Sequence, residues 1–168
     1  MEQPEVSWRA MTPKDIDEVV ALAEVVHPGF FEERAVFAER LQLFPIGARI
    51  LEREGLAIGY ALSHPWERGK VPCLNSLLGG IPGNAETYYI HDLALLPIAR
   101  GKRAAGRLVR ALAFLAKELG FPSMSLVAVN GSRVFWEKQG FHVVDLPALS
   151  EKLASYEATA VLMERQLQ

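Results

Sequence analysis

The chain has 168 residues, a mass of 18.6 kDa and 50% hydrophobic residues, which excludes a disordered protein and predicts one globular domain over residues 1–168. A formal net charge of −2 excludes a whole-protein field that would draw the molecule onto nucleic acid or an anionic membrane. The single cysteine, Cys73, excludes an internal disulfide and offers no metal-site spacing, so we expect no metal and a reducing, cytoplasmic location.

The first third of the chain predicts two helices between short strands. Thr12 suits a helix N-cap and Pro13 suits the first helical position. That helix is expected to stop at His27, and residues 53–55 predict the turn of an antiparallel hairpin. The expected elements are a strand at 6–10, helices at 13–26 and about 32–43, and strands at 47–52 and 56–63.

A loose segment and a second series of strands and helices follow. Residues 65–87 contain too many prolines and glycines for a long regular element, and a loop of this size in a compact domain is often functional. After it we expect a strand at 88–95, a helix that ends at Gly120, a strand at 123–129, a short helix at 132–138, and strands at 141–146 and 158–165.

The order of these elements predicts a mixed α/β (α+β) fold in which helices flank a central sheet. The helix between the strands at 88–95 and 123–129 favours a parallel pair there, whereas the other connections favour antiparallel pairing. The chain shows no basic-then-apolar leader and no apolar run long enough to span a bilayer, so we expect no membrane partner.

The segment 88–107, YYIHDLALLPIARGKRAAGR, runs from an apolar strand through a basic turn directly into an amphipathic helix. A helix N-terminus offers unpaired N–H groups and partial positive charge, and both stabilise a bound phosphate. Side-chain charge at the same place comes from Arg100, Lys102, Arg103 and Arg107. The turn therefore predicts a site for a phosphorylated ligand, a pattern that nucleotide-binding loops of other folds share.

Two motifs in the second half of the chain resemble those of the GCN5-related N-acetyltransferase (GNAT) family. The family's cofactor loop has Arg or Gln, two residues, Gly, one residue, and then Gly or Ala. Arg100 and Ala105 fit this loop, and Arg103 stands where the first Gly is usual. Further on, Asn130 ends a strand, a helix follows, and a Gly-Phe pair opens the next strand, as in the family's second motif. The resemblance implies a mixed, mostly antiparallel sheet in which two parallel strands splay apart to hold acetyl-CoA.

By this resemblance, backbone groups of Leu93, Ala94 and Leu95 pair with the pantetheine arm of the cofactor. The backbone N–H groups expected to hold its pyrophosphate belong to Arg100, Gly101, Lys102, Arg103, Ala104, Ala105 and Gly106. Asn130 reaches the pantetheine arm, caps the following helix, or does both. Trp136 forms an apolar wall beside the cofactor or belongs to the core.

The side chain at position 103 raises a question of backbone geometry. With a helical backbone, the Arg103 guanidinium points outward and adds a charged contact to phosphate, whereas a positive φ strains the loop. Because Ala104, Ala105 and Gly106 leave room beside it, we expect the helical conformation.

His91 is the candidate base. Strand alternation places His91 on one face with Leu93 and Leu95 and turns Asp92 to the other face. An imidazole titrates near about 6.5, which suits removal of a proton from an ammonium. The alternative is a histidine with a structural hydrogen bond.

The candidate acid is less direct. Many family members protonate the leaving thiolate with a Tyr where this chain has Trp136, and an indole cannot do so. Tyr156 is a substitute for that Tyr, or else a partly buried tyrosine in a connecting loop.

By family analogy, the acceptor lies against the loop at 27–33 and the loop from residue 64 onward. Phe30 and Phe31 can form an apolar wall there. The carboxylates of Glu32, Glu33 and Glu67 either attract a cation or are solvated surface charges.

The function that these features predict is acetyl-CoA-dependent N-acetyl transfer to a primary amine, taken as a small molecule, by direct transfer within a ternary complex. The alternative is a non-catalytic acyl-CoA-binding or regulatory module on the same scaffold, which Arg103 and Trp136 keep open. A longer acyl group or an oxygen nucleophile also stays open. The basic residues gather at one turn, so we expect no nucleic-acid partner, and the frequency of dimers in the family leaves a homodimer open.

Overall fold

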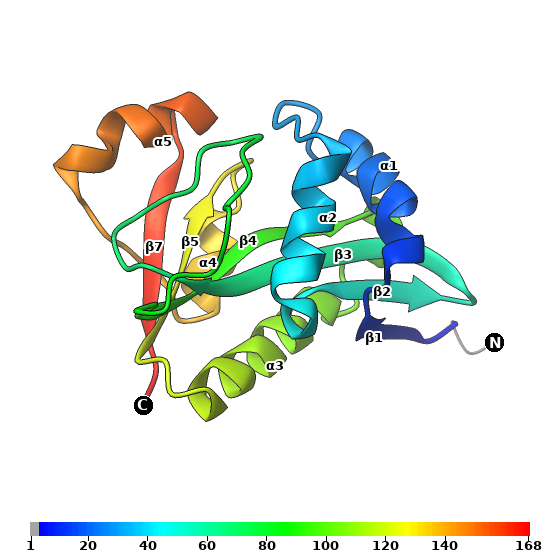
Figure 1. Cartoon of the computed structure of the whole chain (residues 1–168). Coiled ribbons are helices and arrows are strands. Elements are labelled where there is room, and N and C mark those ends of the chain that lie inside the picture. The colour runs from blue at the N-terminus through cyan, green and yellow to red at the C-terminus, as the bar shows by residue number, and fades with distance from the viewer. Residues whose placement is uncertain (1–3) are drawn as a thin grey trace.

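In the computed structural model, residues 4–168 form one mixed sheet with helices on both faces (Figure 1). The elements are β1 (Val6–Ala10), α1 (Ile16–Val26), α2 (Arg34–Leu43), β2 (Arg49–Arg53), β3 (Leu56–Trp66), β4 (Thr87–Leu95), α3 (Ala104–Glu118), β5 (Ser123–Ala128), α4 (Arg133–Lys138), β6 (His142–Val143), α5 (Ser150–Tyr156) and β7 (Val161–Gln166). The strand order is β1-β2-β3-β4-β5-β7-β6. Within the described residues only β4 and β5 pair in parallel, which confirms the expected mixed, mostly antiparallel sheet.

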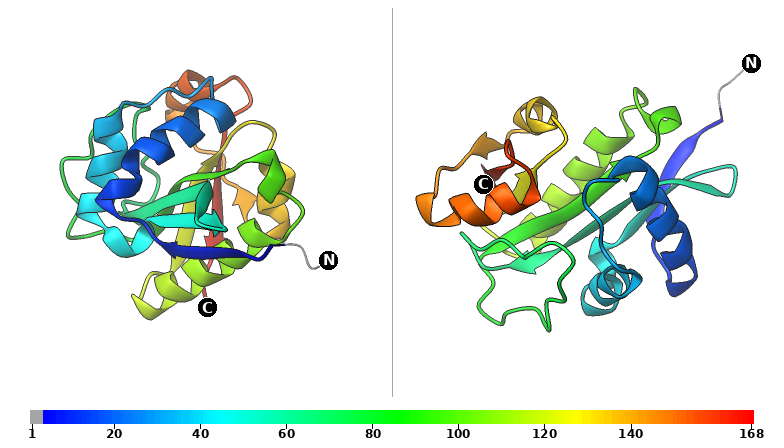
Figure 2. Two further views of the ribbon diagram at one scale, coloured as in Figure 1. Left: turned by 90° about the vertical axis from the view of Figure 1, so that its right-hand side faces the viewer. Right: turned by 90° about the horizontal axis from the view of Figure 1, so that it is seen from above.

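Two clusters of buried apolar side chains occupy opposite faces of the sheet. On one face α1 and α2 pack on β2, β3 and β4, through residues such as Val19, Phe37, Tyr60 and Leu62. On the other face α3 and α4 pack on β4, β5 and β7, through residues such as Leu108, Leu112, Leu126 and Trp136. Figures 1 and 2 show the sheet between these layers. No helix within residues 4–168 has both the length and the apolar character needed to cross a bilayer.

The start of α1 and the first hairpin form where the sequence predicts them. Pro13 opens a short 3-10 turn that leads into α1, and the backbone N–H of Thr12 donates to Asp15 Oδ2 at 2.7 Å. The β2–β3 turn places Glu54 and Gly55 at φ values of 51° and 78°, the combination that a two-residue type I′ hairpin requires.

Three elements differ from expectation. The sequence predicts no helix between residues 146 and 158, yet α5 forms there; none of its residues is buried, so no apolar periodicity marks it. β6 comprises two residues instead of the expected 141–146. β3 continues past residue 63 to Trp66, and Pro65 pairs with Tyr88 inside the ladder.

The parallel strands β4 and β5 are paired over only part of their length. Tyr88, Tyr89 and Ile90 lie beside Met124, Ser125 and Leu126. Past Ile90, this edge of β4 has no strand partner among the described residues. The strands thus separate as the resemblance implies, and the rest of β4 keeps an edge free for another group.

Candidate active site

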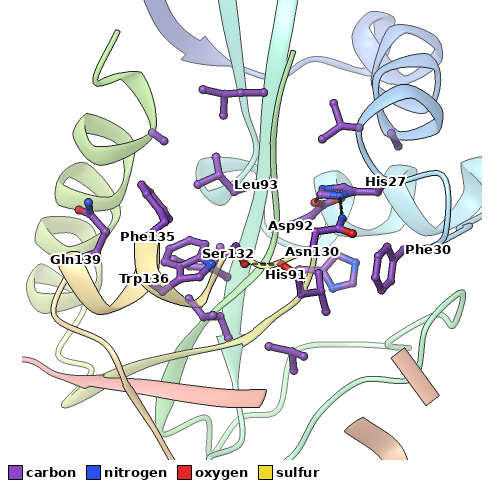
Figure 3. A pocket seen from close by; sticks show the side chains of 18 of the residues that line it. His27, Phe30, His91, Asp92, Leu93, Asn130, Ser132, Phe135, Trp136 and Gln139 are labelled. Carbon is purple, nitrogen blue, oxygen red and sulfur yellow. Dashed lines mark hydrogen bonds and ion pairs between the residues drawn. The ribbon is translucent and has the colours of Figure 1, made fainter. Parts of the chain in front are cut away.

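A cavity of about 760 Å³ opens where β4 and β5 separate (Figure 3). Its walls come from the end of α1, the middle of β4, the start of α3, the end of β5, α4 and the end of α5. The predicted site residues that line it are His91, Leu93, Leu95, Arg100, Gly101, Arg103, Ala104, Ala105, Gly106, Asn130, Trp136 and Tyr156. Lys102 and Ala94 lie outside the lining, and Ala94 is buried against the α1 and α2 side of the sheet.

A β-bulge in β4 decides which side chains face the cavity. In the β3–β4 ladder, Leu62 pairs with Asp92 and Ser63 pairs with Ile90, so His91 is an extra residue in β4. An extra residue of this kind shifts the alternation of side chains beyond it. Figure 3 shows His91 and Asp92 on the same side of the strand as a result.

The bulge overturns the faces expected from strict alternation. His91 contacts Glu32, and Asp92 contacts His27, so both side chains lie on the face that α1 and α2 cover. Leu93 instead packs in the cluster on the α3 side. The prediction that His91 shares a face with Leu93 while Asp92 points away is therefore wrong, because it assumed an unbroken ladder.

His91 and Glu32 form a buried pair. The distance from His91 Nε2 to Glu32 Oε1 is 2.8 Å, and the two side chains are 3% and 6% exposed. The second carboxylate oxygen of Glu32 accepts the backbone N–H of Asn75 at 3.1 Å. Glu32 is therefore not the solvated surface charge that the sequence also allowed, whereas Glu33 is exposed.

The pair sets the tautomer of the imidazole. An ionised carboxylate only accepts hydrogen bonds, so His91 Nε2 donates to Glu32, and the neutral ring carries its lone pair on Nδ1. His91 Nδ1 is buried and has no hydrogen-bond partner among residues 4–168. His91 lines the cavity, and this nitrogen can take up a proton.

His27 and Asp92 form a second pair in the same cavity. His27 Nε2 lies 2.9 Å from Asp92 Oδ1, and the hydroxyl of Tyr60 donates to the other oxygen of Asp92. Burial alone lowers the pKa of His27, but the hydrogen bond and charge of Asp92 outweigh it, so the pKa is raised above its ordinary value. Burial likewise opposes ionisation of Asp92, but His27 overcomes it and lowers the pKa of that carboxyl.

Asn130 bridges the cavity between the end of β5 and the end of α1. Its Nδ2 lies 3.1 Å from His27 Nδ1 (Figure 3) and donates to that nitrogen when the ring is neutral. Its backbone N–H donates to Glu157 Oε1 at 2.8 Å. The helix-capping role is therefore wrong, because Ser132 is the N-cap of α4 and the Asn130 side chain contacts His27 instead.

The basic turn ends in a left-handed residue. Arg103 has φ 58° and ψ 12° and occupies the N-cap position of α3, while Gly101 has φ 78°. The expected helical backbone at Arg103 is wrong: α3 begins one residue later, at Ala104. A left-handed residue directly before helical backbone resembles the turns in which successive N–H groups form an anion-binding concavity. The turn adopts this conformation without the usual Gly.

Trp136 and Tyr156, the two aromatic residues of the predicted site, lie in different surroundings. Trp136 is 6% exposed and stacks edge-on against Phe135 and Phe141, with ring centroids 4.9 and 5.4 Å away. It is thus core and cavity wall at once, and Figure 3 shows it beside Phe135. The hydroxyl of Tyr156 donates to the carbonyl of Pro72, and burial raises the pKa of this tyrosine.

The sequence did not mark His27, Asp92 and Tyr60 as one network. His27 follows the last residue of α1, where it serves as a helix stop, and nothing local pairs it with a strand far along the chain. The bulge that turns Asp92 toward His27 depends on ladder pairing between β3 and β4. A sequence pattern carries no signal for that pairing.

A comparison with known proteins finds a family model that matches most of this chain. A model of the acetyltransferase (GNAT) family matches residues 15–141. No curated protein matches the chain.

Solved structures resemble the whole fold at low sequence identity. The loading GNATL domain of CurA from Lyngbya majuscula has a TM-score of 0.81 and 14% identity, covering 98% of each chain. Ard1 from Thermoplasma volcanium has a TM-score of 0.75 and 18% identity, covering 97% of this chain and 98% of its own. The GphF GNAT-like decarboxylase in complex with isobutyryl-CoA has a TM-score of 0.80 and 16% identity, covering 96% of this chain and 100% of its own. At these identities the likeness shows the fold.

Proposed function

This chain belongs to the acetyltransferase (GNAT) family, and on that premise we propose that it moves an acetyl group from acetyl-CoA to the primary amine of a small molecule, by direct transfer in a ternary complex. Family membership supports a CoA-type donor and an acyl-transfer fold. The observation that carries the proposal is the cavity that joins the N-terminus of α3 to the His91–Glu32 pair. A turn suited to phosphate and a candidate proton acceptor then line one cavity.

The chain offers separate groups for the two ends of the donor. The N–H groups at the start of α3 and the charges of Arg100 and Arg103 suit the pyrophosphate. The edge of β4 beyond Ile90 lacks a strand partner among the described residues. The backbone of Leu93 to Leu95 can therefore pair with the amide groups of the pantetheine arm as a strand would.

The proton path follows from the two histidines. As the amine nitrogen bonds to the thioester carbon and the carbon–sulfur bond breaks, His91 Nδ1 accepts the amine proton, directly or through water. His27, as an imidazolium held by Asp92 through Nε2, donates the proton of Nδ1 to the departing thiolate once the Asn130 amide turns away from that nitrogen. Tyr156 is the weaker candidate acid, because its hydroxyl already donates to Pro72 and burial raises its pKa.

Calorimetric titration tests the donor half of the proposal. We expect acetyl-CoA and CoA to bind, and dephosphorylated pantetheine to bind at least about tenfold more weakly, because it lacks the charge-assisted contacts of the phosphates. Arg100→Glu combined with Arg103→Glu should weaken CoA binding by like-charge repulsion, while Arg34→Glu, on the far helix α2, should not. Equal binding of pantetheine and CoA would contradict the assigned turn.

Turnover tests the acceptor half. Release of free CoA thiol in the presence of a panel of primary amines is the expected result. Tight CoA binding without turnover on any amine or peptide N-terminus would favour the non-catalytic acyl-CoA-binding module instead. A cytoplasmic location and a homodimer are further proposals, separate from these two assays.

A further inference from the structure

One buried arginine has a complete hydrogen-bonding edge without a partner. Arg40, in α2, is 1% exposed. Its Nη1 donates to Glu39 Oε1 and to the carbonyl oxygen of Ser76, each at 3.0 Å. Its Nε and Nη2 have no hydrogen-bond partner among residues 4–168. These two nitrogens form one side of the guanidinium plane, so their N–H bonds point the same way.

A second arginine of the chain shows what this edge binds. Arg68 uses Nε and Nη2 to donate to the two carboxylate oxygens of Glu164, each at 3.1 Å. A carboxylate is the planar acceptor that takes two parallel N–H bonds at once. The edge of Arg40 is the same pair of atoms, and it is buried.

The protein's own carboxylates near Arg40 are those of Glu39 and Glu32, which accept other hydrogen bonds and leave the Nε and Nη2 edge unpaired within the described residues. Glu39 accepts Arg40 Nη1 and the backbone N–H groups of Leu78 and Gly79. Glu32 accepts His91 and the backbone N–H of Asn75. A buried donor without an acceptor destabilises a fold, so such a group calls for a partner from outside the chain.

The other buried polar atoms without a partner in the described part of the chain lie in the same region. They are His64 Nε2, Trp66 Nε1 and His91 Nδ1. The ring of His64 lies 5.4 Å from that of Trp66 and 6.4 Å from that of His91, centroid to centroid. Burial lowers the pKa of His64 to about 3, with a smaller contribution from the charge of Arg40. His91 also lines the cavity, so this region adjoins the cavity there, whereas Arg40, His64 and Trp66 lie outside the cavity lining.

A polar segment covers this region. Residues 72–79 are attached through hydrogen bonds from the Tyr156 hydroxyl to Pro72, from Arg40 to Ser76, from the backbone of Leu78 and Gly79 to Glu39, and from the backbone of Asn75 to Glu32. Pro72 is buried, whereas Leu77 is 60% exposed. A ligand can reach the Arg40 edge only when this segment moves aside.

We propose that the Nε and Nη2 edge of Arg40 binds a carboxylate of the substrate, so that the acceptor is an amine that also carries a carboxylate, such as an amino acid. The assignment rests on the proposed function, since it names the acceptor class of that same reaction, with the carboxylate held beside the cavity and not within its present lining. Arg40 holds the carboxylate while the amine reaches His91. A carboxylate on the acyl group of the donor has the same chemistry, and the experiment separates the two sources.

The test compares each standard amino acid with its own α-amide, which keeps the amine and side chain but loses the negative charge. We expect kcat/KM for the preferred amino acid to exceed that of its amide by about 10- to 100-fold, the contribution of hydrogen bonds between charged groups. This comparison uses only the wild-type protein, so its outcome does not depend on whether a variant folds. Equal rates on acid and amide would overturn the proposal and assign the Arg40 edge to ordered water.

A variant assigns the preference to Arg40. Arg40→Lys keeps the positive charge but loses the two-pronged edge, so the acid-to-amide ratio should fall toward one, with little change in activity on the amide. Arg34→Lys, an exposed arginine at the start of the same helix, should leave the ratio unchanged. A purely structural role for Arg40 would lower both rates together and keep their ratio, which contradicts the proposal.

Two further experiments distinguish failure of the acceptor assignment from failure of the proposed function. If acetyl-CoA and succinyl-CoA are compared and only the succinyl donor shows an Arg40-dependent gain, the carboxylate belongs to the donor and the acceptor assignment is wrong. If no amine turns over, the proposed function fails, and direct binding still tests Arg40. In that case an amino acid, but not its amide, should raise the melting temperature of the wild-type protein and not that of Arg40→Lys.

Discussion

The two histidines of the cavity differ in which nitrogen is available. His91 donates through Nε2 to Glu32 and keeps Nδ1 without a partner among the described residues. His27 uses both nitrogens, one toward Asp92 and one toward Asn130. A nitrogen with an unused lone pair suits a base, and a ring that a carboxylate holds in its protonated form suits an acid. The contacts of these side chains therefore divide the proposed proton transfers between them.

Replacing His91 by Ala tests the base. We expect kcat/KM to fall about 10²- to 10⁴-fold, the usual contribution of a positioned general base, with CoA affinity unchanged. The loss should be largest where the imidazole is neutral and the amine is still mostly protonated, and it should shrink at lower pH, because a protonated imidazole cannot accept a proton. The measurement is a pH profile of thiol release, with His142→Ala, an exposed histidine in β6, as the control. A profile of unchanged shape and height would remove His91 from the mechanism.

Replacing Asp92 by Asn tests the origin of the raised pKa of His27. The hydrogen bond and charge of Asp92 disappear while burial remains, so we expect the pKa of His27 to fall below its ordinary value of 6.5. NMR titration of the imidazole resonances measures it directly. Asp17→Asn, which alters an exposed carboxylate of α1, is the matched control. A pKa that stays above 6.5 would mean that other groups hold the proton on His27.

The same substitution has a consequence for stability. Because folding raises the pKa of His27, this group stabilises the folded state below pH 6.5, and the contribution is lost as pH rises through the folded-state value. Asp92→Asn should therefore lower the free energy of unfolding more at pH 6 than at pH 9. Urea unfolding at both pH values provides the comparison.

At the scale of elements, the junction between the basic turn and α3 stores strain. A non-Gly residue in the left-handed region costs about 1 kcal/mol, and Arg103 is such a residue. We expect Arg103→Gly to raise the free energy of unfolding by about 0.5–1 kcal/mol, the relief of strain being partly offset by the greater entropy of an unfolded Gly. Chemical denaturation measures this change. The contrast is Arg110→Gly inside α3, which should lower the free energy by about 1 kcal/mol; two losses would mean that Arg103 is not strained.

The start of α1 depends on an ionised carboxylate. Arg9 donates to both oxygens of Asp15, and hydrogen bonding to Arg9 lowers the pKa of Asp15 to about 2, against the opposing effect of burial. The ionised form therefore favours folding, and its contribution is present above about pH 4 and lost as pH falls through 2. Asp15→Asn should cost about 1–2 kcal/mol at pH 7 and almost nothing at pH 2. Acid unfolding curves check this, and an equal loss at both pH values would contradict the ionic origin.

The sequence predicts a helix or turn correctly where the residues of that element determine it. It fails where a pairing strand or a packing partner determines the structure. Thr12 and Pro13 start a helix through local backbone chemistry, and the turn at 53–55 needs only a left-handed Gly. The bulge at His91 depends on how β3 pairs with β4, and α5 has no buried face to generate a pattern. The basic turn before α3 lines the cavity, and its role in binding the cofactor stays a prediction, whereas the His27–Asp92 pair was missed because it follows from that bulge.

At the scale of the whole molecule, two separate cores hold β4 and β5 in positions that leave them unpaired with each other beyond Ile90. One core ties β2, β3 and β4 to α1 and α2, and the other ties β4, β5 and β7 to α3 and α4. β4 belongs to both, and β5 meets it over only three residue pairs. The sheet therefore keeps an unpaired inner edge without losing either core. A ligand that occupies this edge adds contacts to both halves of the molecule.

Such a ligand should stabilise the fold as a whole. At 100 times its dissociation constant, CoA should add about 2.7 kcal/mol to the free energy of unfolding, which for a chain of this size raises the melting temperature by about 5–10 °C. Hydrogen exchange should show where the gain arises. Amides that exchange by global unfolding should gain the same protection throughout the fold, and extra protection is expected at 91–95 and 127–130, where β4 and β5 face each other without pairing. A higher melting temperature without extra protection at 91–95 and 127–130 would place CoA elsewhere on the surface, because a ligand between the splayed strands supplies the missing hydrogen bonds of that edge.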